Sequence, residues 1–126
     1  MILDQIKTVL DTLAADVTCP MSGGVYYGIC NAQSLPKWNH FVFNRARLTS
    51  TNNNSYTYLY EIHIVHENYI PEDYELTVIH ALKEAIPGFS LADDITYDYY
   101  QKGDTQVIVE ICNMTFKKVR KVNDGR

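Results

Sequence analysis

Residues 55–67 read SYTYLYEIHIVHE, and this stretch decides the fold. Tyrosine, isoleucine and valine fill it, and these residue types favour extended backbone, so the stretch predicts a long strand. Two histidines in it, His63 and His66, stand three residues apart. Because side chains alternate between the two faces of a strand, these imidazoles point to opposite sides and cannot hold one metal ion together.

Two amphipathic helices are expected on either side of this strand. In 2–15, apolar residues recur every three or four positions and form one stripe. The same spacing returns in 71–86, where Pro71 suits the first helical position and Pro87-Gly88 ends the pattern.

Four more segments are predicted as strands from their β-branched, aromatic or alternating residues: 25–32, 39–50, 94–101 and 105–119. The order along the chain is therefore helix, strand, strand, strand, helix, strand, strand. This order predicts an α+β fold, with a mostly antiparallel sheet of about five strands and two helices packed on one face.

Hairpins are expected at two polar loops, 49–55 and 102–104, because each lies between two predicted strands. Alternation along 39–50 also assigns side chains to faces of the sheet. It places on one side Phe41, Phe43, Arg45 and Arg47.

Length and composition indicate an ordinary globular domain. The chain has 126 residues, of which 46% are apolar, which predicts one domain over 1–121 with a frayed tail at 122–126. Three widely spaced cysteines form no C-x-x-C pair and indicate reduced thiols in a cytosolic protein. The first residues lack the basic and apolar regions of a signal peptide, and no apolar run is long enough for a membrane helix.

Charge is unevenly distributed along the sequence. Residues 1–116 hold six Lys or Arg and fourteen Asp or Glu, whereas 117–126 hold five cations and one acid. An acidic body argues against direct nucleic-acid recognition, which needs a broad basic surface. The basic segment is either a solvated, frayed end or a contact surface for an acidic partner.

No segment carries a local signature of catalysis, cofactor binding or metal binding. Cys30 and Cys112 fall in predicted strands and suit core positions, and Glu72-Asp73 suits the start of a helix. We therefore predict no catalytic, cofactor-binding or metal-ligating residue. A site that the fold assembles around His40 or His80 stays open, since these residues lie in separate elements.

Several predicted strands are apolar on both sides, which two helices on one face cannot shield. The stretches VYYGIC, YLYEIHIV and VIVEICNM have this character. A sheet that is apolar on both faces needs a second covering layer. We therefore expect either an oligomer or a docking partner.

The order of elements resembles the tail-terminator and head–tail joining proteins of long-tailed bacteriophages. The resemblance rests on the segments ILDQIKTVLDTL, HFVFNRARL, YTYLYEIHIVHE, DYELTVIHALKEAI and ITYDYYQKGDTQVIVEICNMTFKK. It covers nearly the whole chain as a pattern of elements. It implies a structural protein without enzyme activity that forms a ring, usually hexameric, between the tail tube and the head connector.

That resemblance also implies a location and a set of contacts. The protein would act in the cytoplasm of the bacterial host during assembly and then in the virion. Exposure and charge alone select the expected interface residues: Asn52, Asn53, Asn54, Lys117, Lys118, Arg120 and Lys121. The alternative is a mobile loop tip and a frayed end.

Two other classes of function remain open on the sequence. One is a monomeric or dimeric binding or regulatory module, or another minor phage structural protein. The other is a small enzyme, which would require a concave pocket in which His40 or His80 meets carboxylates.

Overall fold

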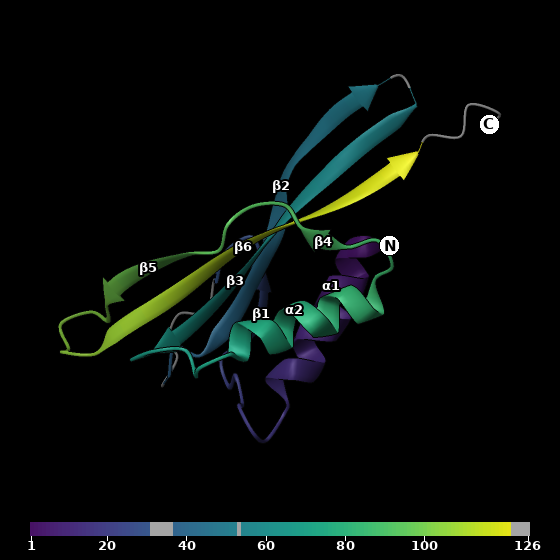
Figure 1. Cartoon of the computed structure of the whole chain (residues 1–126). Helices are drawn as coiled ribbons and strands as arrows, with labels where there is room; N and C mark the ends of the chain where they lie inside the picture. The colour runs from purple at the N-terminus through teal and green to yellow at the C-terminus, as the bar shows by residue number, and fades with distance from the viewer. Residues whose placement is uncertain (31–36, 53, 122–126) are drawn as a thin grey trace.

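Two helices lie on one face of a twisted six-stranded sheet (Figure 1). The computed structural model describes residues 1–30, 37–52 and 54–121. The elements within them are α1 (Ile2–Ala14), β1 (Gly24–Tyr27), β2 (His40–Asn52), β3 (Ser55–Glu67), α2 (Tyr74–Ala85), β4 (Ser90–Leu91), β5 (Thr96–Gln101) and β6 (Ile108–Lys121). The predicted α+β class is confirmed, and the short strand β4 is an addition to it.

The strands are ordered β1-β2-β3-β6-β4, and β5 pairs with the other end of the same β6 edge. All described pairings are antiparallel except that of β1 with β2, which is parallel. A parallel pair needs a crossover connection, which here spans 28–39. Strand β1 ends at Tyr27, so the prediction of a strand over 25–32 is too long and Cys30 lies beyond it.

The core fills the space between the helices and the covered face of the sheet. Its fully buried members are Ile6 and Leu10 of α1, Val78 and Leu82 of α2, and Phe41, Ile62, Ile64, Cys112, Met114 and Phe116 of the sheet. The prediction of Cys112 as a core residue is confirmed, and burial raises the pKa of its thiol to about 12. All three cysteines are free thiols.

Helix α2 begins three residues later than expected. Pro71 lies before the helix, and its carbonyl accepts a hydrogen bond from the Tyr74 N–H. Asp73 is the N-cap residue with φ 66°, and its side chain makes no capping bond. The prediction of Pro71 at the first helical position is therefore wrong, because a left-handed residue and a turn intervene.

A bulge in β2 changes which face its basic residues occupy. Arg45 lies opposite Tyr60, but Arg47 lies opposite Leu59, so the register shifts at Ala46. Beyond a bulge the alternation of faces inverts. Arg45 and Arg47 therefore lie on opposite faces of the sheet, and the prediction that they share one is wrong.

Strands β2, β3 and β6 run on past both helices as a three-stranded extension, seen at the upper right of Figure 1. We call this extension, residues 45–52, 55–59 and 117–121, the arm. Lys121 pairs with Ser55, so β6 is ordered to its last described residue. The alternative of a frayed end is thus wrong for residues 117–121, while Asn53 and the expected tail at 122–126 lie outside the described residues.

Candidate functional site

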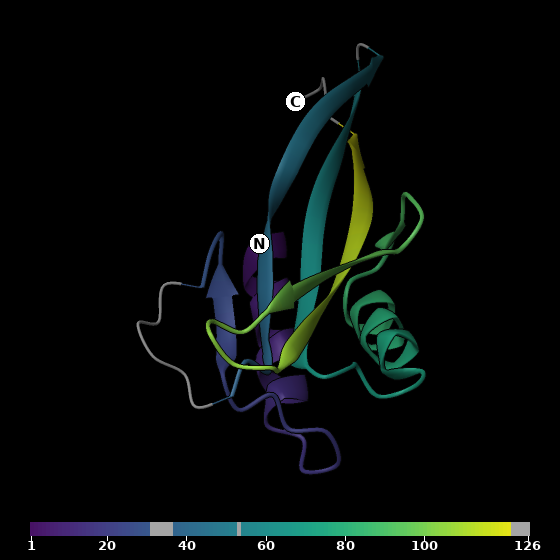
Figure 2. The ribbon, with the colours of Figure 1, turned by 90° about the vertical axis from the view of Figure 1, so that its left-hand side faces the viewer.

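A pocket of about 670 Å³ occupies the face of the sheet that the helices leave open. At this end β5 crosses in front of β3 and β6 in Figure 2, with α1 behind the sheet. The pocket is lined by Gly28, Ile29, Cys30, Trp38, His40, Val42, His63, Val65, Asp98, Tyr100, Val109, Ile111 and Asn113.

Strand register explains why these side chains gather. His40 lies opposite Val65, which lies opposite Ile111 in β6, and Ile111 in turn lies opposite Asp98. The next row of the same face joins Val42, His63 and Asn113. Because residues opposite one another share a face, one face of four strands forms the floor and one wall.

A chain of hydrogen bonds crosses the floor from β3 to β5. Asn113 Nδ2 donates to Asp98 Oδ2 at 2.9 Å and to Thr96 Oγ1 at 3.3 Å. A carboxylate only accepts, so the amide is oriented and its Oδ1 is the atom 2.7 Å from His63 Nδ1. Nδ1 of His63 therefore donates, and its Nε2 lies 3.8 Å from Glu61 Oε1.

His40 is the buried polar residue of the pocket, with 6% of its surface exposed. Its Nδ1 is sealed from solvent and has no hydrogen-bond partner among the described residues. Tyr26 packs edge-on against the ring, with 5.6 Å between the centroids. Burial lowers the pKa of His40 below its usual 6.5, so the imidazole is neutral at pH 7.

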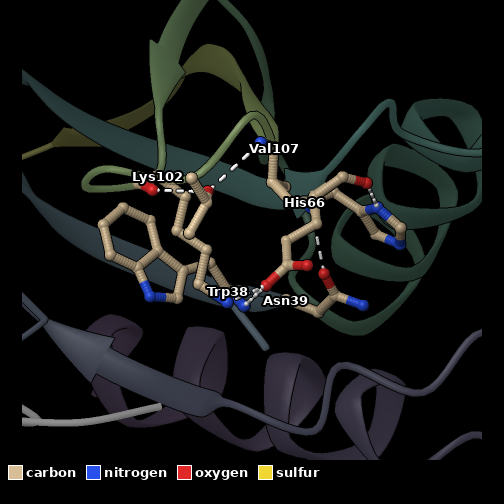
Figure 3. A network of polar contacts seen from close by, with 7 residues as sticks. Trp38, Asn39, His66, Lys102 and Val107 are labelled. Carbon is tan, nitrogen blue, oxygen red and sulfur yellow. Dashed lines mark hydrogen bonds and ion pairs between the residues drawn. The ribbon is translucent and has the colours of Figure 1, made fainter. Parts of the chain in front are cut away.

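A polar network anchors Trp38, one wall of the pocket, to the ends of β3 and β5 (Figure 3). Glu67 Oε2 accepts hydrogen bonds from the backbone N–H of Trp38 at 2.7 Å and from Lys102 Nζ at 2.5 Å. The Glu67 N–H donates to Asn39 Oδ1 at 3.0 Å. Lys102 Nζ also lies 5.9 Å from the Trp38 ring centroid. The bond from Lys102 is the chief cause that lowers the pKa of Glu67.

The histidines separate as the strand pattern predicts. His63 lines the pocket, whereas His66 Nδ1 is 2.8 Å from the Glu67 carbonyl oxygen at the end of β3. His80 is exposed on α2. Within residues 1–30, 37–52 and 54–121, no group of three or more His, Cys, Asp or Glu side chains could hold a metal ion.

Cys30 also lines the pocket, but the described contacts do not assemble a nucleophile with a base. Its thiol interacts with the Tyr26 hydroxyl, and no hydrogen bond joins it to His40 or His63 within the part of the chain that the structure describes. An activated cysteine needs a base within hydrogen-bond reach. The arrangement is therefore that of a binding pocket with a polar chain on its floor.

The chain itself covers much of the open face at this end. Val65 and Val109 point away from the helices, yet only 6% and 1% of their surfaces are exposed. Part of the apolar excess predicted for the sheet is thus shielded by the curled edges. Exposed apolar residues remain at the rim of the pocket (Ile29, Tyr100), beside it (Tyr69, Tyr99) and on the arm (Leu48, Val119).

The arm brings the expected interface residues together. Asn52 ends β2, Asn54 lies in the turn, and the basic residues of β6 pair alongside β3. The arm holds six cations and no carboxylate: Arg45, Arg47, Lys117, Lys118, Arg120 and Lys121. Lys118 Nζ donates to the Pro87 carbonyl oxygen, and none of the ion pairs in the described residues includes an arm cation.

The opposite end of the molecule is acidic. Around the start of α2 and the β5–β6 turn it gathers Glu67, Glu72, Asp73, Glu75, Asp98, Asp104 and Glu110, with the cations Lys37 and Lys102 near Glu67. Glu110 accepts bonds from the Ile70 N–H and the Tyr99 hydroxyl, both at 2.8 Å. These neutral donors position the carboxylates without cancelling their charge.

The pocket residues were missed because they meet only in the folded chain. Trp38, Asp98 and Tyr100 come from a connection and an edge strand whose curvature no local pattern encodes. One signal was present: pairing 39–50 with 56–67 around their polar loop places His40 and His63 on the same face.

Comparison with known proteins gives a likeness of fold only. No family model and no curated protein matches this chain. Among solved structures, one chain aligns over 98% of this protein and 96% of its own length, with a TM-score of 0.49 and 12% identity. A match at this level carries no statement about function. Within the described part of the chain, no helix is long and apolar enough to cross a membrane.

Proposed function

We propose that this chain is a structural assembly protein that closes into a ring through contacts between the basic arm of one copy and the acidic end of the next. The more specific role proposed is that of a phage tail terminator or head–tail joining protein. This role rests on the order of elements, which resembles that class, with the tail tube and the head connector as further partners.

The separation of charge between the two ends is the observation that supports the proposal. Six of the eleven cations stand on the arm, whereas all fifteen carboxylates lie outside it. Both ends also expose large apolar side chains, Leu48 on the arm and Tyr69 and Tyr99 at the acidic end. Opposite charge combined with exposed tyrosine is the composition expected of a protein interface.

A contact between two different surfaces favours a ring over a simple dimer. A dimer with a two-fold axis pairs each surface with itself, which would bring basic arm to basic arm. A head-to-tail contact repeats from copy to copy, and it closes into a ring when the rotation between copies permits.

The test is sedimentation velocity at low salt over a wide range of protein concentrations. The wild-type chain should form a discrete oligomer, and the double variant Lys117→Glu, Arg120→Glu should be monomeric. A second double variant, Glu72→Lys, Asp104→Lys, should also be monomeric alone. Mixing the two double variants should restore assembly with the two alternating, because the acidic arm of one variant then meets the basic end of the other, while the unchanged acidic end of the first meets the unchanged basic arm of the second.

The matched control changes two cations outside the arm, Lys7→Glu and Lys83→Glu, and should assemble like the wild type. Both residues are exposed on the helices. A wild-type chain that stays monomeric up to its solubility limit, alone and with purified tail-tube protein, would contradict the proposal. So would loss of assembly in the control, because the effect would then follow net charge alone.

A second candidate function is a small binding module, and the pocket on the open face supports it. A concave, mostly apolar cavity with a few convergent polar groups is the usual form of a ligand site. The pocket lies away from the arm of its own chain, but it shares Asp98 with the acidic end.

A further inference from the structure

We infer that the pocket on the open face binds a small organic cation, an amine carried on an aromatic or aliphatic body. This site goes beyond the ring contact and does not depend on it. Its support comes from the shape, the polarity and the charge of the lining.

The apolar part of the lining suits the body of such a ligand. Four aliphatic side chains on the floor come from three adjacent strands: Val42, Val65, Val109 and Ile111. Trp38 and Tyr100 add aromatic side chains. At about 670 Å³ the cavity lies within the range of pockets for small ligands. Aromatic rings also attract cations through their negative faces.

The polar part of the lining accepts hydrogen bonds. His63 donates through Nδ1 to Asn113, and its Nε2 faces Glu61 Oε1 at 3.8 Å. Asp98 adds a carboxylate whose partner is the neutral amide of Asn113. No lysine or arginine is among the described residues that line the pocket. An ammonium group finds an acceptor in Asp98, which would repel a carboxylate ligand. Lys102, the cation beside the Trp38 ring, is paired with Glu67.

His40 marks the position of the site within the fold. The residue is 94% buried and its Nδ1 has no partner within the described part of the chain, which is uncommon for a buried polar atom. Its described ring contact is the edge of Tyr26. Keeping an imidazole here instead of an aliphatic residue costs stability, so packing alone does not account for a histidine in the pocket lining.

Trp38 makes the test direct, because it is the single tryptophan of the chain and lines the pocket. The probe is phenethylamine, titrated into the full chain at about pH 7.5 while Trp38 fluorescence is recorded. A saturable change with a Kd of about 1 mM is expected for a ligand of this size. The matched anion 3-phenylpropionate has a similar body and should bind at least about tenfold more weakly.

Two variants locate the binding. Asp98→Asn removes the carboxylate from the wall and should weaken phenethylamine binding about tenfold. Asp104→Asn makes the same chemical change in the neighbouring turn, outside the pocket, and should leave the Kd unchanged. Both residues are exposed, and circular dichroism checks that each variant is folded.

Several outcomes would overturn the inference. They are no saturable response at about tenfold above the expected Kd, equal binding of amine and anion, or an unchanged Kd in Asp98→Asn. If Asp98→Asn fails to fold, the wild-type titrations with amine and anion decide the question alone. A negative result leaves the ring untouched, because assembly is measured without either probe.

Discussion

The same three strands, β2, β3 and β6, meet two different environments along their length. We call the part of these strands outside the arm the base, residues 40–44, 60–67 and 108–116. At the base, the helices cover one face of the sheet, and the edges of the sheet partly cover the other face. On the arm, neither layer extends far enough, and the strands continue past the helices (Figure 1). In β3 the base holds Ile62 and Ile64 at 0% exposure, whereas the arm holds Thr57 and Tyr58, which are half-buried.

This difference shows that hydrogen bonding between strands and burial of apolar side chains stabilise the sheet independently. The hydrogen-bonded register of β3 with β6 is unbroken from Glu67 to Ser55. Yet the base can bury apolar surface, while the arm relies on pairing and on long side chains lying along the sheet. Leu59 illustrates the second mode, since it is 9% exposed between Arg47 and Lys117, its cross-strand neighbours.

The largest effect is expected from truncating a base residue of β3. Ile62→Ala should lower the free energy of unfolding by about 2–5 kcal/mol, because the cavity lies among fully buried neighbours. Thr57→Ala, on the arm of the same strand, should cost less than about 1 kcal/mol. Urea unfolding followed by circular dichroism measures both, and equal losses would remove the distinction between base and arm.

A smaller effect is expected where the base is closed by polar contacts. Glu67→Gln should cost about 1–3 kcal/mol, because the Glu67 side chain is 14% exposed and bonded to Lys102. The pKa of Glu67 is lowered in the folded chain, so its contribution is present above the ordinary value of 4.5 and is lost as the pH falls through the folded pKa.

Urea unfolding at several pH values tests this linkage. The difference in the free energy of unfolding between wild type and Glu67→Gln should be largest at neutral pH and should decrease below pH 4.5. Glu72→Gln, an exposed acid close by, should change stability little at any pH. A gap independent of pH would mean that the carboxylate charge contributes nothing.

Mild acid should lower the free energy of unfolding through His40, which lies in the base and not on the arm. Burial lowers its pKa, so below 6.5 the unfolded chain binds a proton that the folded chain resists. Stability is therefore fully present above pH 6.5 and falls as the pH drops from there. The ring faces Tyr26 and shares the pocket with His63 and Asp98.

Thermal unfolding between about pH 7.5 and about pH 5.5 measures this loss. The variant His40→Gln should show a flatter dependence on pH than the wild type. The control His80→Gln changes an exposed histidine of α2 and should keep the wild-type slope. If the melting temperature of His40→Gln depends on pH as steeply as that of the wild type, a group other than His40 causes the loss of stability in acid.

The smallest effect concerns the like charges of the arm. Arg120→Gln should raise stability by about 0.2–0.5 kcal/mol at low salt, because it removes a cation from a group that includes no carboxylate. At high salt the gain should vanish through screening. Lys83→Gln in the last turn of α2 should show no such gain, since a cation there favours the helix dipole.

Local patterns in the sequence predicted the parts of the fold that depend on neighbours along the chain. The stripe of α1 and the hairpins β2–β3 and β5–β6 follow from periodicity and from turn residues between strands. The start of α2 was misplaced because Pro71 suits a turn as well as a first helical position. The face of Arg47 was misassigned because a bulge leaves no mark in the alternation of residue types.

Features that depend on distant contacts were not predictable. The parallel pairing of β1 with β2 has no local signal, and the apolar residues after Tyr27 suited a strand, so Cys30 was placed in one. The pocket needs Trp38 and Asp98 brought together by curvature of the whole sheet. The basic segment after Phe116 was recognised by its charge, yet only its pairing with Ser55–Leu59 makes it a strand of the arm.

The central position of β3 has a consequence for biosynthesis. A ribosome delivers β2 and β3 together, but β6 emerges only after about forty further residues. One edge of β3, which is rich in tyrosine and isoleucine, is therefore translated long before its permanent neighbour. During that interval the nascent chain carries an open template for wrong pairing. Slowing translation between Glu67 and Ile108 should therefore increase inclusion bodies, whereas slowing it before Ser55 should not.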